Sequence, residues 1–394
     1  MIRVFVFEFI GIVRMQKWKL VVVIVGLGTA VNCLPANAKT LTPLKIAVDV
    51  GIPSPNLTND AVVYFKKGIV LYRQGDKRGA MPLATTFSGI ASYNQALKLN
   101  PQLAAAYYNR GIVRTDLGDN RGAVADYNQA LKLDPNYSDA YNNRGNARRE
   151  IGDAKGAMED YNQALRLNPQ DAEAYNNRGI TRYHMGDTQG AIADYNQALQ
   201  INPKLVDAYL NRGSVRADLG NVKEAIADFN RALQINPKDS QAYYNRGLTK
   251  RETGDMTGAI QDYTQALRIN PNFVDAYNNR GSTHLRMGDT NKAIADFNQA
   301  IQRNPKLAQA YYNRGTAQSN LGNQQGAIQD FSKALQIDPN LPQAYGNRGV
   351  ARFNLGDNKS ALADLQKAAQ MFQELGLTDE AKHAVDIIER FGGN

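Results

Sequence analysis

Two polar side chains stand side by side in a segment, Ala-Tyr-x-Asn-Arg-Gly, that recurs eight times at a spacing of 34 residues. An asparagine amide donates and accepts hydrogen bonds at once, as a peptide group does, and a guanidinium matches carboxylates or phosphates. These rows favour recognition of a ligand rather than bond breaking. We number each repeat from 1 to 34, with place 1 at Ala104, so that asparagine stands at place 6 and arginine at place 7.

The asparagine row is interpreted as a surface for a bound main chain. One amide per repeat would hold an extended polypeptide through its backbone groups, with little sequence preference. The alternative is that each amide bonds only to the backbone of a neighbouring repeat. The row consists of Asn109, Asn143, Asn177, Asn211, Asn245, Asn279, Asn313 and Asn347. The tyrosines expected on the same surface are Tyr108, Tyr183, Tyr244 and Tyr312.

The arginine at place 7 is matched by an aspartate at place 23 in the same eight repeats. Opposite charges on facing helices predict bidentate ion pairs within each hairpin. Such a pair contributes little net stability, yet the loss of one partner is costly. The alternative is an arginine ladder that binds an anionic ligand. The structural pairs that we single out are Arg144 with Asp160, Arg178 with Asp194 and Arg212 with Asp228.

No pattern for catalysis or metal binding accompanies these rows. The only cysteine, Cys33, excludes disulfides and structural zinc, and three histidines are scattered along the chain. There is no nucleophile–base pair and no phosphate-binding loop, so we expect no enzyme activity, no metal and no cofactor. A formal net charge of +9 without a run of like charges argues against nucleic-acid binding.

A fixed period of this length indicates stacked helical hairpins rather than one globular core. In the first regular repeat, apolar residues follow helical spacing over 104–117 and again over 122–133. Gly118 suits a left-handed helix end, and Asp119 suits the cap of the next helix. Glycine at place 8 and alanine at place 20 are expected to let the two helices approach closely, as with Gly145 and Ala157.

These residues resemble the tetratricopeptide repeat, with an aromatic residue at place 4, Gly at 8, Ala at 20, an aromatic residue at 24, Ala at 27 and Pro at 32. The resemblance covers nine units. The arginine at place 7 departs from the apolar residue usual there, and the ninth unit has Leu365 at the aromatic place and Gln373 at the proline place. It implies an all-α, right-handed solenoid superhelix in which the first helix of each hairpin lines a concave groove. Place 6 is then expected to point into that groove, like the asparagine ladder of O-linked N-acetylglucosamine transferase.

Both ends of the array depart from the regular pattern. Residues 61–103 are expected to form a divergent repeat, with Ala80 at the alanine place and a loop that includes Thr85-Thr86. Eight regular repeats follow over 104–375. Residues 376–394 are expected to form a capping helix and tail, with Ala381, Ala384, Val385 and Ile388 on its apolar face.

The beginning of the chain predicts export. Lys17 and Lys19 precede a short apolar run and then Ala36-Asn37-Ala38, so residues 1–38 read as a signal peptide, and 39–60 as an extended linker. The apolar run is short for a bilayer, so we expect cleavage and no stable membrane insertion, with an uncleaved anchor as the alternative. Whether Met1 or Met15 starts the chain stays open. The expected destination is a bacterial periplasm or, because the repeats resemble cyanobacterial arrays, a thylakoid lumen.

The expected function is non-catalytic: a scaffold or assembly factor that holds an extended segment of another protein in the groove. The variable groove places carry eight acids and three arginines, which favours a neutral or basic segment. The alternative is an accessory subunit of an envelope enzyme or glycan-export system that binds carbohydrate through the Asn and Tyr rows. The sequence leaves the partner and the oligomeric state open.

Overall fold

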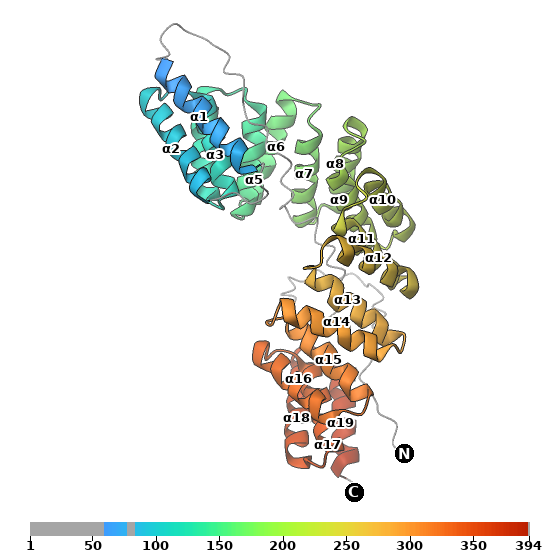
Figure 1. Ribbon diagram of the computed structural model, residues 1–394. Coiled ribbons are helices and arrows are strands. Elements are labelled where there is room, and N and C mark those ends of the chain that lie inside the picture. Colours follow the sequence, from blue (N-terminus) through green and yellow to red (C-terminus); the bar gives the residue numbers. More distant parts are fainter. Residues whose placement is uncertain (1–58, 77–82, 393–394) are drawn as a thin grey trace. The chain divides into compact units, whose positions relative to one another are not determined.

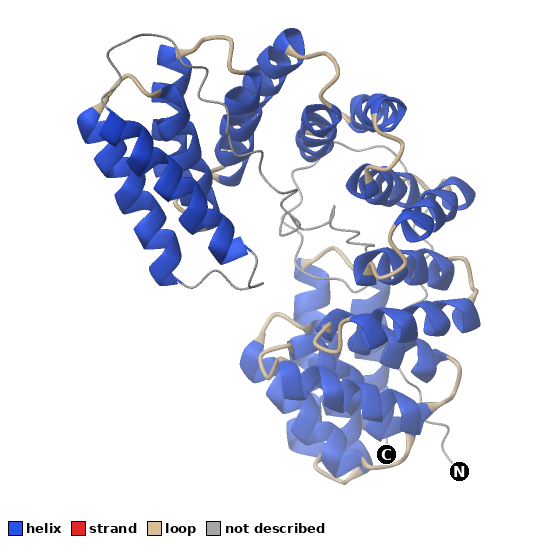
Figure 2. Ribbon diagram, turned by 45° about the horizontal axis from the view of Figure 1, so that its top comes forward, coloured by secondary structure: helices blue, strands red, loops and turns tan. Residues whose placement is uncertain are grey.

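The computed structural model describes residues 59–76 and 83–392, which form 19 helices and contain no strand (Figure 1, Figure 2). The predicted signal peptide, and nearly all of the predicted linker, lie outside the described residues. The described residues fall into two compact units that divide between Ile235 and Asn236. We call residues 59–235 the first unit and residues 236–392 the second unit.

The first unit consists of five helical hairpins. Their first helices are α1 (Asn59–Asp76), α3 (Ala104–Asp116), α5 (Ser138–Glu150), α7 (Ala172–His184) and α9 (Val206–Asp218). Their second helices are α2 (Leu83–Leu99), α4 (Asn120–Leu133), α6 (Ala154–Leu167), α8 (Thr188–Ile201) and α10 (Val222–Ile235).

The second unit consists of four hairpins and one further helix. The first helices are α11 (Ser240–Glu252), α13 (Val274–Arg286), α15 (Ala308–Asn320) and α17 (Pro342–Asn354). The second helices are α12 (Met256–Ile269), α14 (Thr290–Arg303), α16 (Gln324–Ile337) and α18 (Asn358–Glu374), and the chain ends with α19 (Thr378–Gly392). The predicted all-α solenoid of helical hairpins is confirmed.

The turn inside the first regular repeat follows the predicted chemistry. Gly118 has a φ of 80°, which an L side chain rarely adopts. The Asp119 carboxylate then accepts a hydrogen bond from the backbone N–H of Gly122 at 2.9 Å and so caps α4. The helix ends at Leu133, directly before Asp134-Pro135.

The two helices of a hairpin meet at the glycine of place 8. A Cβ atom added to Gly145 would lie 2.7 Å from the ring of Tyr161. The fully buried aromatic side chain of place 24, rather than Ala157 at place 20, is therefore the group for which this glycine makes room. The expected close approach is present, but its partner is a ring.

The divergent first repeat differs from the prediction in where its extra residues go. They lengthen both helices, because α1 has 18 residues and α2 has 17, whereas α3 has 13 and α4 has 14. Thr85-Thr86 lie within α2 and not in a loop. Gly89, four residues before Tyr93, occupies the position that we had assigned to Ala80.

The end of the array agrees with the prediction except on one face. The long helix α18 runs to Glu374, and α19 packs against it. Ala384 and Ile387 of α19 are buried, whereas Val385 is 42% exposed. Our assignment of Val385 to the apolar face was wrong, because the buried stripe passes through Ile387 instead.

Successive first helices contact one another within each unit: α3 with α5, α5 with α7 and α7 with α9, and likewise from α11 to α17. Successive second helices make no comparable contact in the described ranges. The first helices therefore lie on the more tightly curved side of each unit, which we call the inner face.

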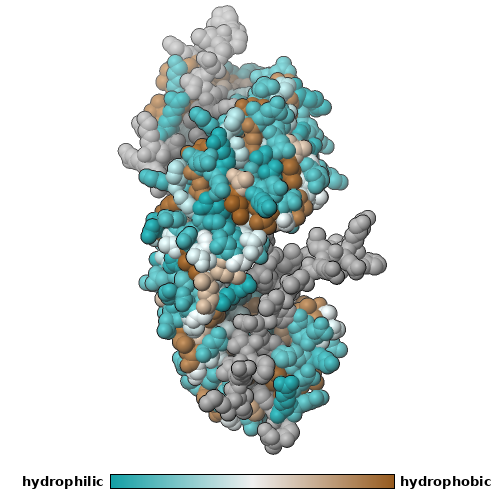
Figure 3. All heavy atoms as spheres, turned by 90° about the vertical axis from the view of Figure 1, so that its right-hand side faces the viewer, coloured by the Kyte–Doolittle hydropathy of each residue, from teal (hydrophilic) through white to brown (hydrophobic). Residues whose placement is uncertain are grey.

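The surface gives no sign of a bilayer-spanning element among the described residues. No described helix combines the length and the apolar character that a membrane crossing requires. On the face drawn in Figure 3, hydrophilic side chains predominate and hydrophobic ones are scattered among them.

The glycine of place 8 can be tested within the first hairpin. A Cβ atom at Gly68 would lie 2.5 Å from the buried ring of Tyr93, so Gly68→Ala should lower the free energy of unfolding by about 1–3 kcal/mol. Urea unfolding monitored by circular dichroism measures this. Gly89→Ala is the control, since its nearest neighbour atom would be 3.9 Å away. Equal destabilisation by both changes would contradict the assignment.

Candidate functional site

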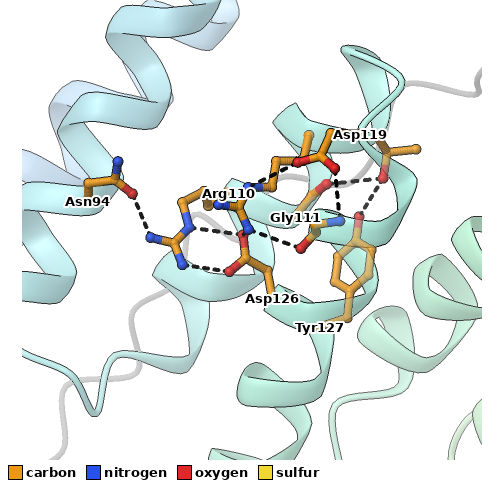
Figure 4. A network of polar contacts seen from close by, with 9 residues as sticks. Asn94, Arg110, Gly111, Asp119, Asp126 and Tyr127 are labelled. Atoms are coloured by element: carbon orange, nitrogen blue, oxygen red, sulfur yellow. Dashed lines mark hydrogen bonds and ion pairs between the residues drawn. The ribbon is translucent and has the colours of Figure 1, made fainter.

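The arginine of place 7 connects three helices, as Figure 4 shows for Arg110. Its Nε and Nη2 atoms donate to the two carboxylate oxygens of Asp126 in the same hairpin, at 2.9 and 2.6 Å. Its Nη1 atom donates to Asn94 in the second helix of the preceding repeat. The guanidinium carbon lies 5.5 Å from the ring centre of Tyr107. One side chain thus joins both helices of its repeat and ties that repeat to the one before.

The three ion pairs singled out in the sequence have the same geometry. The distances from Nε and Nη2 to the carboxylate are 2.9 and 2.6 Å for Arg144 with Asp160, 2.9 and 2.7 Å for Arg178 with Asp194, and 3.0 and 2.6 Å for Arg212 with Asp228. The aspartates are buried. Because three nitrogen atoms of each guanidinium bond to protein groups, the arginine row acts within the array rather than as an anion ladder.

Sequence reasoning missed a second cation beside most of these carboxylates. Arg148 and Arg182, at place 11, each approach the same aspartate as the place-7 arginine, at 3.0 Å. Lys250 takes this position in the second unit, 2.8 Å from Asp262. The signal was present, since Arg or Lys occupies place 11 in six of the eight regular repeats.

The asparagines of place 6 bond to the preceding repeat. In six of the eight regular repeats, Nδ2 donates to the side chain that lies 35 residues earlier, at place 5. In the first unit these bonds are Asn143 to Tyr108 at 3.0 Å, Asn177 to Asn142 at 3.1 Å and Asn211 to Asn176 at 2.9 Å. In the second unit they are Asn279 to Tyr244 at 2.8 Å, Asn313 to Asn278 at 3.0 Å and Asn347 to Tyr312 at 3.1 Å.

This geometry corrects one part of the predicted ladder. The amide N–H groups do not stand open for a bound main chain, because the packing of successive first helices brings place 6 against place 5. A buried donor needs an acceptor there, and Tyr or Asn supplies it. Asn109, Asn211 and Asn245 are at most 1% exposed. The signal that we missed was the Tyr or Asn at place 5 in six of the eight repeats.

The tyrosines of place 5 belong to the same contacts between repeats. Tyr108 is buried, with its ring centre 6.0 Å from that of Tyr127 and 4.6 Å from that of Tyr137. Burial raises the pKa of Tyr312 to about 12, so its hydroxyl stays neutral and can accept the amide N–H. Tyr244 is buried as well, whereas Tyr183, at place 12, is partly exposed.

The side chains that the inner face offers to solvent stand chiefly at place 13. Tyr183 of α7 donates its hydroxyl to Asp218 of α9, and Tyr72 of α1 donates to Asp116 of α3 at 2.7 Å. Because these bonds bridge successive first helices, place 13 lies on the inner face. Its residues in the other repeats are Glu150, His184, Glu252, Arg286, Asn320 and Asn354, all exposed.

The inner face of the first unit is acidic. Besides three carboxylates at place 13, it carries Asp139, Glu173 and Asp207 at place 2. The basic side chains beside them are Arg149 at place 12 and His184 at place 13. Burial lowers the pKa of His184, which keeps it neutral at pH 7. In the second unit the charges of Glu252 and Asp275 are balanced by two arginines, Arg251 and Arg286. The other residues at places 2 and 13 of this unit carry amide side chains.

Family models match the chain from residue 113 to 375. One described as TPR repeat matches 113–152, 145–186 and 248–288, and three described as tetratricopeptide repeat match 172–205, 206–239, 229–261, 274–307, 308–341 and 342–375. The chain belongs to the tetratricopeptide repeat family. Arrays of this family are protein-interaction scaffolds, and this chain is built as one. A search of curated proteins found no match.

Several solved structures are similar to parts of this chain. The crystal structure of MamA is 28% identical, with a TM-score of 0.39, and covers 41% of this chain and 94% of its own. YrrB, described as a TPR protein with an unusual peptide-binding site, is 24% identical, with a TM-score of 0.41, and covers 48% and 96%. A tetratricopeptide repeat protein from Parabacteroides merdae is 22% identical, with a TM-score of 0.49, and covers 63% and 98%.

The ion pairs can be ranked by mutation. Asp194→Ala leaves two partly buried cationic groups without their buried carboxylate, so the free energy of unfolding should fall by about 3 kcal/mol. Asn162→Ala removes only the exposed contact from Arg178 to the preceding repeat and should cost less than about 1 kcal/mol. Thermal and urea unfolding measure both. Similar losses for the two variants would contradict the dominant role of the aspartate.

The bond between Tyr183 and Asp218 predicts a titration shift. Burial raises the pKa of Asp218, while the Tyr183 hydroxyl stabilises the carboxylate and opposes that rise. Tyr183→Phe removes the opposing effect, so the pKa of Asp218 should increase further. Carboxyl chemical shifts followed by NMR between pH 3 and 8 report it. An unchanged or lower pKa would show that the bond is not formed in solution.

Proposed function

We propose that this chain holds an extended segment of another protein against its inner face and catalyses no reaction. The observation that carries the proposal is that some places in the repeat are uniform and bonded within the array, whereas another is variable and exposed. Places 6, 7 and 23, which bond within the array, are uniform in all eight regular repeats, whereas place 13, exposed on the inner face in seven of the eight, changes from repeat to repeat. A surface with one variable exposed residue per repeat suits a partner segment in an extended conformation.

The proposed mode of binding differs from the one predicted from the sequence, in which each place-6 amide donates to and accepts from the main chain of the partner. Six of the eight asparagine nitrogens donate to the preceding repeat. Affinity therefore has to come from side chains at places 2 and 13. Polar and charged groups at such a surface determine which partner binds more than how tightly it binds. The chain therefore selects a segment by its charge and spacing.

We also propose that the chain works outside the cytoplasm. The support is the charged start, short apolar run and Ala-Asn-Ala site within residues 1–38. A periplasm or a thylakoid lumen would both fit that leader.

Site-specific photo-crosslinking tests the inner face with a matched pair of positions. Glu150 on α5 and Glu159 on α6 are both exposed glutamates of one repeat, on its first and second helix. A photoreactive amino acid at 150 should capture a discrete protein partner in cells, and the same residue at 159 should not. Equal capture at both positions, or only carbohydrate bound to the purified chain, would contradict the proposal.

A further inference from the structure

Two places on the first helix of each regular repeat face the repeat before it. The residues at places 3 and 10 are at most 1% exposed in all eight regular repeats. In the first of these repeats, Ala106 and Val113 belong to one apolar cluster with Tyr93 of α2. The second helix of the preceding repeat therefore covers places 3 and 10.

The same two places are exposed on α1. Gly68 meets the ring of Tyr93 as the glycine of place 8 does in the regular repeats, so Val63 stands at place 3 and Val70 at place 10. Val63 is 58% exposed and Val70 is 51% exposed. Helix α1 lies at one end of the first unit, and no described helix precedes it in the chain (Figure 1). A face that makes a contact between repeats elsewhere thus carries two exposed valines on α1, two helical turns apart.

This face of α1 is only partly adapted to water. The outer face of a terminal repeat is usually polar. Lys66 and Lys67 follow that rule, since these exposed lysines replace the asparagine and the arginine of places 6 and 7. The two valines do not follow it, and Val63 is larger than the alanine that stands at place 3 in every regular repeat. Apolar residues retained at these two places indicate an apolar cover.

The chain just before α1 contains a segment with the matching pattern. Over residues 44–52, five apolar residues alternate with Lys45, Ala47, Asp49 and Gly51; they are Leu44, Ile46, Val48, Val50 and Ile52. Strict alternation of this kind is typical of an extended segment that is apolar on one side. These residues lie outside the described part of the chain, and that part contains no strand with which they could pair. Their apolar side therefore suits a helix face.

The lengths of the segment and the helix agree. Helix α1 has 18 residues and is about 27 Å long, at about 1.5 Å per residue. Residues 44–52 in an extended conformation would span about 30 Å. Residues 53–58 connect this segment to the start of α1, and Pro53, Pro55 and Asn56 among them favour a reversal of direction. Because six residues can span about 20 Å, the segment can run antiparallel along α1.

A second copy of the chain fits this face less well. If two α1 helices met through their valines, Lys66 and Lys67 of one copy would lie close to the same lysines of the other, and like charges in an interface are unfavourable. Residues 44–52 contain one lysine and one aspartate, so they bring no excess of either charge. The charges therefore favour the segment of the same chain.

We propose that residues 44–52 pack along α1 and cover Val63 and Val70, so that a segment of the same chain closes the beginning of the array. At the end of the chain α19 has the corresponding role, because it packs against the last hairpin through α18. The proposal goes beyond the proposed function and is independent of what the inner face binds.

Thiol labelling of the full chain tests the proposal, with Cys33→Ser in every variant. Val63→Cys and Val70→Cys each place a thiol on the face in question. Leu321→Cys is the matched control, because this residue of the second unit is 53% exposed. A maleimide should modify the first two variants at least tenfold more slowly than the control. Equal rates would show that the face of α1 is open and would overturn the proposal.

Substitutions in the segment identify the cover. Val48→Asp with Val50→Asp places two charges on its apolar side, so the thiol of Val63→Cys should be labelled at least fivefold faster. Ala47→Asp with Gly51→Asp adds the same charge on the other side and should alter the rate less than twofold. If the first pair leaves the rate unchanged, another element covers the valines and the proposal is wrong. Protection that is lost on dilution would identify that element as a second copy.

Discussion

The contact on which the whole array depends is the bidentate bond between the arginine of place 7 and the buried aspartate of place 23. A guanidinium has a planar fork of donors, so it can hold a carboxylate with two nitrogens and reach another helix with the third. A buried aspartate is costly without such compensation. The pair therefore contributes little to net stability. Its main effect is to fix the orientation of the two helices of a hairpin relative to each other and to the preceding repeat.

That constraint decides what the remaining polar residues can do. Once the hairpins stack with fixed orientation, successive first helices lie close, and the place-6 amide meets the side chain of place 5 in the preceding repeat. The uniform polar rows are thereby used in building the stack. On the function we propose, recognition falls to positions whose residues change along the chain, and these give the inner face of the first unit its acidic character.

Much of the fold follows from the period alone, since helix length, turn residues and the aromatic–glycine seam are local properties of one repeat. The asparagine row was harder to interpret, because strict repetition is expected both of a ligand-binding row and of a contact between neighbours. Only the residue at place 5 distinguishes the two cases. The asparagine of one repeat must be compared with the place-5 residue of the preceding repeat, not with that of its own repeat. The extra residues of the first repeat were misplaced for a similar reason: Ala80 suited the alanine place by type, whereas distance from Tyr93 selects Gly89.

The hydrogen bonds of each place-6 amide were beyond sequence reasoning for a different reason. The sequence shows that an asparagine is present, but it does not show which of its two polar atoms meets a neighbouring side chain. Asn211 illustrates this, since its nitrogen has a partner and its oxygen has none in the described part of the chain. Which half of an amide is used depends on the packing of three helices.

Hydrogen exchange of the asparagine side-chain amides, followed by NMR in the free protein, tests most directly whether these rows serve the stack. The Nδ2 protons of Asn177 and Asn211, which donate between repeats, should exchange far more slowly than those of the exposed Asn320. Exchange as fast as that of Asn320 would show that the amides are open to solvent and free for a ligand, which would contradict the account.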